Sequence, residues 1–477
     1  MQGDFDRVTF DADDHFANVL LQQGRLLLPA DFNEQSAIHH HFLRTLIIDL
    51  KGRRWRAAGG FKIIFASAEE FKIAKGRYYI DGIPCENPKA CKIEDQPFKP
   101  VPEGKDWQEV IVGENIFAFY LDCWERHVTW INYPRLRETA LGGPDTATRL
   151  QIAWQVRPLT KPILLNQLSL LGSALRLRQE AGLLGDDQGE LDSLISKIEG
   201  MERVNEEALD CKNVNAVLDL LDKAPPRLIA DAKRDADNNN DPCAIAPDAQ
   251  YRGRENQLYR VEIHKPGLAK ETGGATFKWS REAGSVVFRV LDVDSADKKD
   301  GRIQIVLESL GHDRRTGLCV NDWVELMDTD IEMRQEDAPL MQVTNIDSQR
   351  RLVTLKGRGA EHPGVKLDCQ PILRRWDHQG DSSADGALLI VEKNSDDDSG
   401  WISLERGIRI RFAPGGLYRT GDYWLIPARV ATGDVEWPIV GASRRALEPH
   451  GVRHHRAALA IVGKVTGGSW EVDDKQC

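Results

Sequence analysis

Three histidines near the end of the chain are the first candidates for chemistry, because imidazole transfers protons near neutral pH and binds transition metals. His450 and His454 are four residues apart, and His455 follows directly. On a helix, a spacing of four would place two rings on one face. Pro449 and Gly451 instead favour a loop or the start of a strand. The sequence alone does not decide whether these histidines bind a metal, and ordinary loop and core histidines are the more common interpretation.

A second group of ionisable residues, Asp122, Glu125, Arg126 and His127, lies within a candidate strand at residues 116–128. Successive side chains of a strand point to opposite faces, so Asp122 lies opposite Glu125 and His127. These side chains therefore do not converge from the sequence alone. We expect them to form a structural network rather than a catalytic site.

The remaining groups of possible ligands are weaker. His39, His40 and His41 lie in a predicted helix, where consecutive side chains point about 100° apart and cannot form one ligand cluster. The cysteines are scattered without a Cys-x-x-Cys pair, which predicts reduced thiols rather than a disulfide framework or a zinc site. They are Cys85, Cys91, Cys123, Cys211, Cys243, Cys319, Cys369 and Cys477.

The nearest match to a calcium-binding loop begins with Asp235, Asp237 and Asn239. It has Asn240 where the sharp turn needs glycine and Ala246 where the loop needs a bidentate glutamate, so we interpret it as a solvated linker. Motifs for phosphate-binding loops, zinc proteases and serine nucleophiles do not occur in the sequence. We therefore predict no catalytic residue, no cofactor-binding residue, no metal site and no enzymatic activity.

Composition limits the classes of function. The net charge of −11 argues against a general binder of nucleic acid or of anionic membranes. No apolar run reaches the ~18 residues that a membrane helix needs. Residues 1–7 lack the basic and apolar regions of a secretory signal. We expect a cytoplasmic protein that makes no direct membrane insertion.

One helix near the start of the chain has the clearest pattern. Asp31 is the expected cap, with Glu34 three residues on as in a capping box. Apolar residues then recur at helical spacing to Leu50, and Gly52 ends the pattern. The stripe is wide enough to pack on a neighbouring subunit as well as on its own domain.

Short runs of β-branched and aromatic residues between turn signals predict strands over most of the chain. The candidates are residues 60–65, 77–80, 116–128, 150–156, 257–263, 275–290, 323–327, 340–343, 351–355, 408–412, 423–426 and 459–462. Leucines at helical spacing between residues 164 and 175, and a second stripe from Leu191 to Met201, predict a central helical insert. The fold class is therefore mainly β with α-helical segments (α+β) and multi-domain. We expect small β-barrel or sandwich modules, an N-terminal helix and the insert.

Changes of pattern divide the chain into four segments. Residues 1–160 hold the N-terminal helix and a β domain, and residues 161–240 hold the helical insert and a linker. Residues 241–360 are predicted as a β-barrel or sandwich, and residues 361–477 as a C-terminal β domain. A polar run at residues 235–242 marks the linker, and the acidic residues 394–399 a solvated loop.

Several long segments together resemble an uncharacterised bacterial family that is encoded in phage-tail-like contractile injection clusters and in some prophage-like loci. The resemblance spans most of the chain and departs most at residues 159–240. The segments that carry it are Gly3–Asp11, His15–Phe16, Gln22–Arg25, Ala30–Gln35, Trp124–Thr129, Ala140–Arg149, Asp241–Cys243, Glu255–His264, Phe277–Arg281, Gly284–Phe288, Gly421–Arg429, His450–Gly451 and His454–His455.

The resemblance implies a structural component of a contractile injection system, either associated with the baseplate or attaching a tail fibre. Its partners would be other structural proteins of the machine and further copies of itself, with no nucleic acid, and it would lie in the cytoplasm assembled into a particle. Two alternatives stay open. One is a cargo or effector carried by the particle. The other is a surface-glycan-binding module, since twelve tryptophans could supply stacking platforms, although buried core tryptophans are the more common case.

Overall fold

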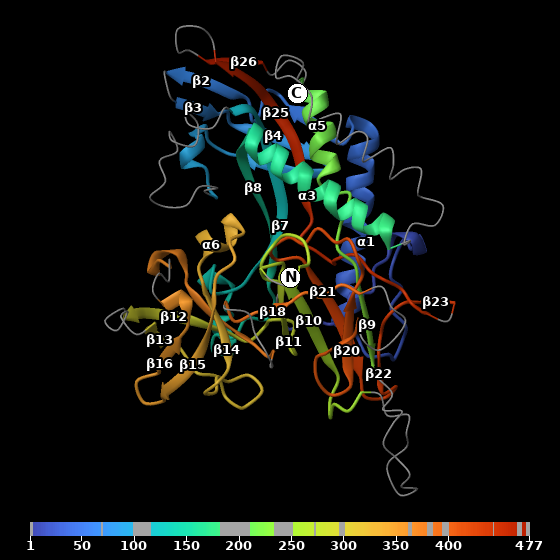
Figure 1. Cartoon of the computed structure of the whole chain (residues 1–477), viewed down its shortest axis with the longest axis vertical. Coiled ribbons are helices and arrows are strands. Elements are labelled where there is room, and N and C mark those ends of the chain that lie inside the picture. Colours follow the sequence, from blue (N-terminus) through green and yellow to red (C-terminus); the bar gives the residue numbers. More distant parts are fainter. Residues whose placement is uncertain are drawn as a thin grey trace, which may run out of the picture.

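The computed structural model describes residues 3–67, 70–98, 116–181, 210–232, 251–270, 273–294, 301–360, 365–378, 385–393, 400–441, 443–464 and 470–473. Over these residues the chain is mainly β, with several antiparallel sheets, an N-terminal helix and a central helix, which confirms the predicted fold class. In Figure 1 the helices flank a sheet in the upper half, and a barrel lies at the lower left. None of the helices in the described ranges is both long and apolar enough to cross a membrane.

The N-terminal helix begins earlier than predicted. Helix α1 runs from Pro29 to Lys51 and follows Leu28, whose backbone is extended, so the prediction that Asp31 caps it is wrong. Proline at the first helical position fixes the helical φ and lacks the N–H that would otherwise need a cap. Glu34 instead accepts a hydrogen bond from Thr9. Thr9 belongs to residues 3–28, which precede α1 and which we call the N-terminal arm. Gly52 ends the helix with φ +84°, as predicted.

The upper sheet joins two strands from residues 116–160 to the last two strands of the chain. Its order is β26 (Trp470–Asp473), β25 (His454–Lys464), β7 (Ile116–Val128) and β8 (Arg149–Thr160), all antiparallel. Helices α3 (Lys161–Glu180) and α5 (Cys211–Leu220) share a hydrophobic core with it. This core holds Leu168, Leu171 and Leu175 against Val214 and Val217.

Two small sheets pack on the other side of the upper sheet. One consists of β1 (Arg54–Ala57), β4 (Gly76–Ile80) and β5 (Ile83–Asn87), and the other of β2 (Ile63–Ser67), β3 (Glu70–Ile73) and β6 (Cys91–Lys92). Their core includes Phe61, Phe119 and Trp154. The β4–β5 turn lies against α1, where a Cβ on Gly82 would approach the Cα atom of Arg44 to 2.5 Å.

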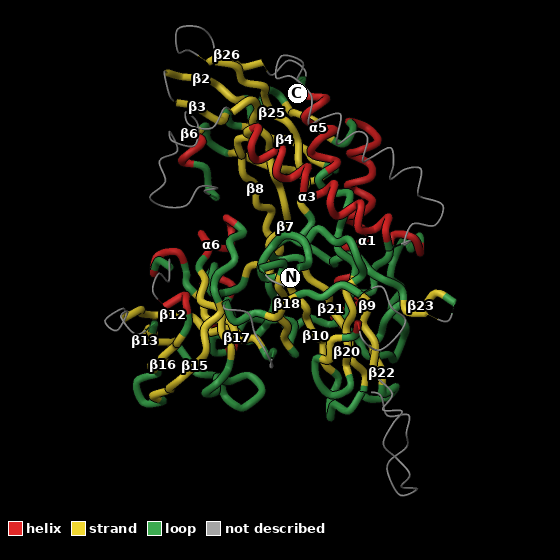
Figure 2. The backbone as a smooth tube through the Cα atoms, viewed as in Figure 1, coloured by secondary structure: helices red, strands yellow, loops and turns green. Residues whose placement is uncertain are grey.

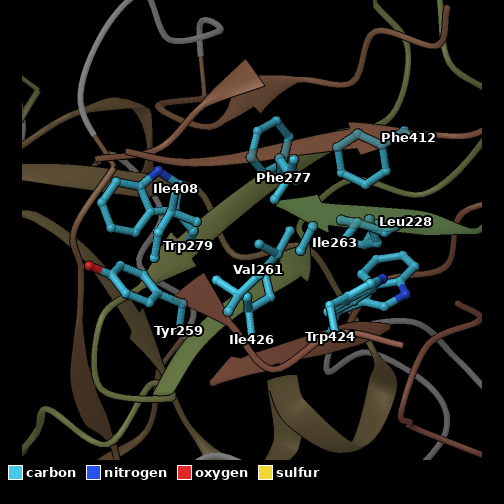
Figure 3. Close-up of a cluster of buried hydrophobic side chains, with 14 of the residues drawn as sticks. Leu228, Tyr259, Val261, Ile263, Phe277, Trp279, Ile408, Phe412, Trp424 and Ile426 are labelled. Carbon is cyan, nitrogen blue, oxygen red and sulfur yellow. The ribbon is translucent and has the colours of Figure 1, made fainter. Parts of the chain in front are cut away.

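The central sheet has the order β18 (Leu388–Leu389), β11 (Thr276–Ser280), β10 (Gln257–Ile263), β21 (Tyr423–Arg429) and β22 (Asp434–Val435). A three-stranded sheet of β19 (Ile402–Ser403), β20 (Ile408–Phe412) and β9 (Leu228–Ala232) shares its core. Figure 3 shows this core, in which Val261, Phe277 and Trp424 of the central sheet pack with Leu228 and Phe412 of the three-stranded sheet. A hairpin of β23 (Ile439–Val440) and β24 (Ser443–Arg444) lies beyond it.

The third part of the structure is a closed six-stranded barrel. It is one of the small β modules that the sequence predicted. Its order is β12 (Val287–Asp294), β13 (Arg302–Leu307), β16 (Leu352–Lys356), β15 (Leu340–Asp347), β14 (Trp323–Met327) and β17 (Ile372–Trp376). The short helix α6 (Thr329–Arg334) connects β14 to β15 and points toward the upper sheet in Figure 2.

Strand pairing crosses the segment boundaries that the sequence suggested. β25 completes the sheet of β7, and β21 lies beside β10 in the central sheet. The division into four consecutive segments therefore stays a prediction about the chain and does not describe which strands pair. The second leucine stripe at 191–201, the linker with its calcium-like match at 235–246 and the acidic loop at 394–399 lie outside the described residues.

The prediction of reduced thiols is wrong at one position. Cys211 is disulfide-bonded, whereas Cys85, Cys91, Cys123, Cys319 and Cys369 are free. Scattered spacing in the sequence could not reveal this bond, because it depends on how the fold brings distant cysteines together.

Candidate functional site

The upper sheet, the central sheet and the barrel meet around a small cavity of about 110 Å³. We call this meeting point the junction. Its lining is unusually charged for a protein interior. It includes Arg126 and His127 of β7, Arg260 and Glu262 of β10, Lys278 of β11, Glu325 of β14, Glu332 of α6 and His454 of β25.

A continuous chain of ion pairs crosses the centre of the junction. Arg260 Nε lies 2.5 Å from Glu262 Oε2, and Lys278 Nζ lies 3.3 Å from Glu262 Oε1 and 2.6 Å from Glu325 Oε1. Trp376 donates its ring N–H to Glu325 at 3.1 Å. These charged side chains are almost completely buried, so each must be paired to offset the loss of hydration. The chain of pairs therefore holds the barrel against the central sheet.

Asp122 and His454 form the second element of the junction. His454 Nδ1 lies 2.9 Å from Asp122 Oδ1, and His454 Nε2 lies 3.0 Å from the side-chain nitrogen of Gln335 in the barrel. Burial lowers the pKa of His454, so the ring is neutral at pH 7, donates to Asp122 and accepts from Gln335. Burial opposes ionisation of Asp122, but His454 and Arg456 hold the pKa of this carboxyl well below its usual range.

An aspartate that orients a histidine is one part of many hydrolytic sites, and we call the pair of Asp122 and His454 the clamp. A general base needs a ring nitrogen that faces the reacting group. Both ring nitrogens of His454 are occupied, and the ring lies against Trp124 with the ring centres 5.0 Å apart. In the described ranges no serine, threonine or cysteine side chain hydrogen-bonds to this histidine. The pair therefore links the upper sheet to the barrel.

The two other histidines near the end of the chain point elsewhere. His455 Nδ1 lies 2.7 Å from Asp81 Oδ2 in the β4–β5 turn. Burial opposes ionisation of Asp81, but hydrogen bonds from His455 and Arg53 lower its pKa to about 2. His450 accepts the backbone N–H of Leu425 at 2.9 Å, and burial lowers its pKa to about 4. Over the described residues, no three His, Cys, Asp or Glu side chains are grouped to hold a metal ion.

The four ionisable residues of β7 reach four different partners. Asp122 contacts His454, Glu125 pairs with Arg44 of α1 at 2.7 Å, and Arg126 pairs with Glu332 of α6 at 2.9 Å. His127 packs edge-on against Phe5 of the N-terminal arm, with ring centres 5.1 Å apart. The network thus connects β7 to the arm, to α1, to β25 and to the barrel. The three consecutive histidines His39, His40 and His41 are exposed on α1 and take no part in these contacts.

A larger polar cleft of about 390 Å³ lies on the other side of β25. Its arginines are mostly paired, as Arg54 is with Asp219 at 2.6 Å and Arg419 with Asp222 at 2.7 Å. Asp422, which also lines the cleft, has its pKa raised to about 7 by burial. The arginines of this cleft are therefore mostly held in ion pairs, whereas the carboxyl group of Asp422 is expected to titrate near neutral pH.

The sequence did not single out the ion-pair residues Arg260, Glu262, Lys278 and Glu325, nor the buried Arg374 of β17. The sequence nevertheless contained a pattern from which these buried charges could have been predicted. Charged residues alternate with apolar ones in β10 and β11, yet both strands lie in the middle of the central sheet and are buried on both faces. Such alternation is typical of a strand whose polar face is exposed to solvent, so these charged residues were expected to be solvated.

Comparison with known proteins gives a family without an assigned function. A model described as a family of unknown function (DUF6519) matches residues 1–470, so the chain belongs to this family. A search of curated proteins found no match. A solved structure titled "Crystal structure of TssK" matches with 9% sequence identity, covering 83% of this chain and 99% of that chain. The TM-score is 0.16, which is too low to support any argument about fold or function.

Proposed function

We propose that this member of the DUF6519 family is a structural component of a phage-tail-like contractile injection machine and acts by assembly rather than by catalysis. In this role it is associated with the baseplate or attaches a tail fibre, and its partners are further copies of itself and other structural proteins of the machine. The family resemblance of the sequence segments gives the context. The apolar surface of the N-terminal arm and α1 is the observation that carries the proposal.

Residues 8–50 hold half of the large apolar side chains that are exposed in the described chain. Twelve of the twenty-four lie in this stretch, with exposed fractions from 37% to 83%. They are Val8, Phe16, Leu20, Leu21, Leu26, Leu27, Leu28, Phe32, Phe42, Leu43, Leu46 and Leu50. Single exposed apolar side chains are ordinary, but such a concentration in one segment marks an interaction surface.

The exposed face of α1 has the spacing of a helix-to-helix seam. Phe32, Ser36, His39, Leu43, Leu46 and Leu50 follow one another in alternating steps of four and three residues, and all are exposed. This 3.5-residue period keeps one side of a helix facing a partner helix. The helix is anchored on its opposite side by fully buried Ile38 and by the pair of Arg44 with Glu125.

The apolar area is large enough for a stable contact. A fully exposed Leu or Phe side chain presents roughly 60–120 Å² of apolar surface. The twelve partly exposed side chains therefore present on the order of 400–900 Å², compared with about 800 Å² per partner in a standard protein interface. The arm itself is held along α1, because Thr9 donates to Glu34 and the backbone N–H of Val19 donates to Gln35 at 2.9 Å.

The alternatives have less support. Six tryptophans, Trp124, Trp154, Trp279, Trp376, Trp424 and Trp437, are buried and so are not available as stacking platforms for a surface glycan. The clamp of Asp122 and His454 has no free ring nitrogen for the hydrolytic step that an effector would need.

The proposal is tested in a producing strain with Phe42→Asp and Leu46→Asp on α1. We expect particles to be missing, malformed or unable to attach, as in a deletion strain, while the purified variant stays folded. Thr45→Asp, an exposed position of the same helix outside the apolar face, is the matched control and should leave the particles normal. Normal, functional particles in the deletion strain, with purified protein that degrades a cell-wall or protein substrate, would replace this proposal with the effector alternative.

A further inference from the structure

A cavity of about 300 Å³ lies beside the junction, where β7 ends and the barrel begins. Its lining combines one buried arginine with several neutral hydrogen-bonding groups and four carboxylates. The lining groups that matter are His127 at the end of β7, Asn132 and Thr148 in the connection to β8, Ser285 before β12, and Arg374 of β17.

Among the described residues, no carboxylate lies within ion-pair distance of the buried cation Arg374. The residue is 7% exposed, and its one hydrogen bond to a described residue runs from Nη1 to the sulfur of Met327 at 3.5 Å. Its Nε atom is buried and has no partner. Each neighbouring cation has its own carboxylate. These pairs are Arg126 with Glu332, Arg260 with Glu262, and Lys278 with Glu325.

An unpaired buried guanidinium is costly, because arginine keeps its charge and its N–H groups lose their hydration. Burial lowers the pKa of Arg374, although Glu262, Glu325 and Glu332 act in the opposite direction from beyond ion-pair distance. A bound anion would supply the missing acceptor. Arginine is suited to this role because its planar fork binds a carboxylate through two parallel hydrogen bonds.

The other lining groups are neutral and partly unused. The Nε2 atom of His127 is buried without a partner, and burial lowers the pKa of this histidine to about 3, so the ring is neutral at pH 7. The hydroxyls of Thr148 and Ser285 make no hydrogen bond to any residue in the described ranges. Hydroxyls and a neutral imidazole both donate and accept, which suits a hydroxylated ligand.

Carboxylates also line the cavity but leave Arg374 unpaired. Asp328 accepts the backbone N–H groups of Ile331 and Lys366, each at 2.9 Å, and Glu332 is paired with Arg126. Asp4 and Asp145 are exposed. None of these four carboxylates therefore serves as an ion-pair partner of Arg374 in the described chain.

We propose that this cavity binds a small carboxylate that also carries hydroxyl groups, which is the chemistry of an acidic sugar. Arg374 binds the carboxylate, and His127, Thr148 and Ser285 hydrogen-bond to the hydroxyls. The volume is at the lower end of small-molecule sites, which fits a single sugar unit. This inference does not depend on the assembly role, because none of the exposed apolar side chains of the arm and α1 that carry that role lines the cavity.

The test uses the full chain and isothermal titration calorimetry at pH 7 with glucuronate, glucose and inorganic phosphate as probes. Saturable binding of glucuronate is expected, with glucose at least tenfold weaker because it lacks the carboxylate. Arg374→Met should weaken glucuronate about 10- to 100-fold, as expected for the loss of charge-assisted hydrogen bonds. Arg289→Met, on neighbouring strand β12 with a side chain 40% exposed, is the matched control and should bind as the wild type does.

Three results would overturn the proposal. They are no saturable glucuronate binding, equal binding of glucose, and binding of phosphate in place of glucuronate. Equal binding by folded Arg374→Met would do so as well. If Arg374→Met fails to fold, Ser285→Ala decides, because it removes one lining hydroxyl at a half-buried position and should weaken glucuronate several-fold. Unchanged affinity in folded Ser285→Ala would contradict the site.

Discussion

The junction and the N-terminal arm with α1 distribute polarity in opposite ways. At the junction, charged side chains such as Lys278 and Glu325 are about 3% exposed and lie in the middle of the protein. On the arm and α1, large apolar side chains such as Leu20 and Leu26 are more than 80% exposed. A single-domain globular protein places these classes the other way round.

The difference indicates two kinds of connection. Apart from Arg374, the buried cations around the junction are paired within the described chain, so these pairs fix how the upper sheet, central sheet and barrel are oriented. Geometry matters more for such pairs than for apolar contacts, because an ion pair must be correctly placed to offset its desolvation. Apolar groups on the arm and α1 have no match within the described chain, so their partner is expected on another molecule. The junction completes one subunit, and the arm connects it to the next.

Removing one member of a junction pair should give the largest loss of stability. Glu325→Ala leaves Lys278 and the ring N–H of Trp376 without their closest acceptor. We expect a loss of about 3–5 kcal/mol in the free energy of unfolding, the usual range for breaking a buried pair. Denaturant unfolding followed by tryptophan fluorescence measures it.

A surface pair provides the matched comparison for that experiment. Arg350 is 80% exposed and lies 4.0 Å from Asp347, so Arg350→Ala should change the free energy of unfolding by less than about 1 kcal/mol. Equal losses in Glu325→Ala and Arg350→Ala would show that the junction pairs do not orient the three parts.

Acidification should lower the free energy of unfolding, but by less than the removal of a buried ion pair. Burial lowers the pKa of His127 to about 3 and that of His378 and His450 to about 4, so these rings are neutral in the folded chain. Their stabilisation is present above the unfolded pKa of about 6.5 and is lost as pH falls toward the folded values. Asp422 acts oppositely, because burial raises its pKa to about 7 and the folded chain takes up its proton first.

Among these four groups, three histidines outweigh one carboxyl group, so their combined contribution to the free energy of unfolding should fall by about 2 kcal/mol per pH unit between pH 6 and pH 5. Denaturant midpoints at pH 7, 6 and 5 measure this slope. His450→Gln, which replaces the ring that accepts the Leu425 N–H by a group that does not titrate there, should reduce it. A midpoint that is constant from pH 7 to pH 5 would contradict the neutral state of these rings.

Sequence patterns predicted the local elements well where a strand or helix carries its own signal. The bounds of β7, β10, β14 and β20 agree with the predicted runs, because each is rich in β-branched or aromatic residues and ends at turn residues. The cap of α1 was wrong by three residues, because the helix begins at Pro29 after Leu28 and not after the capping box residue Asp31.

Long-range partners could not be predicted in the same way. That β25 completes the sheet of β7 depends on residues more than 300 positions apart, for which a single sequence has no signal. The clamp of Asp122 and His454 follows from that pairing, and so does the separation of His450, His454 and His455. Arg374 was missed because an arginine in a strand is normally solvated, and only the closed barrel and its neighbours bury it.

Changes on the exposed face of α1 should have a small effect on folding. They test most directly whether this face is held for a partner, in contrast to the junction. Phe42 and Leu46 are 51% and 54% exposed, so changing them to Asp removes only the buried half of each side chain from the subunit. Aspartate is a weaker helix former than leucine by about 0.5 kcal/mol and ranks with phenylalanine, so most of the cost comes from the lost burial. We therefore expect the double variant to lose about 1–2 kcal/mol in denaturant unfolding of the isolated chain. Ile38→Asp on the same helix, at a fully buried position, should instead lose more than about 3 kcal/mol by burying a charge. If the double variant unfolds as easily as Ile38→Asp, the exposed face belongs to the core of the subunit and is not held for a partner.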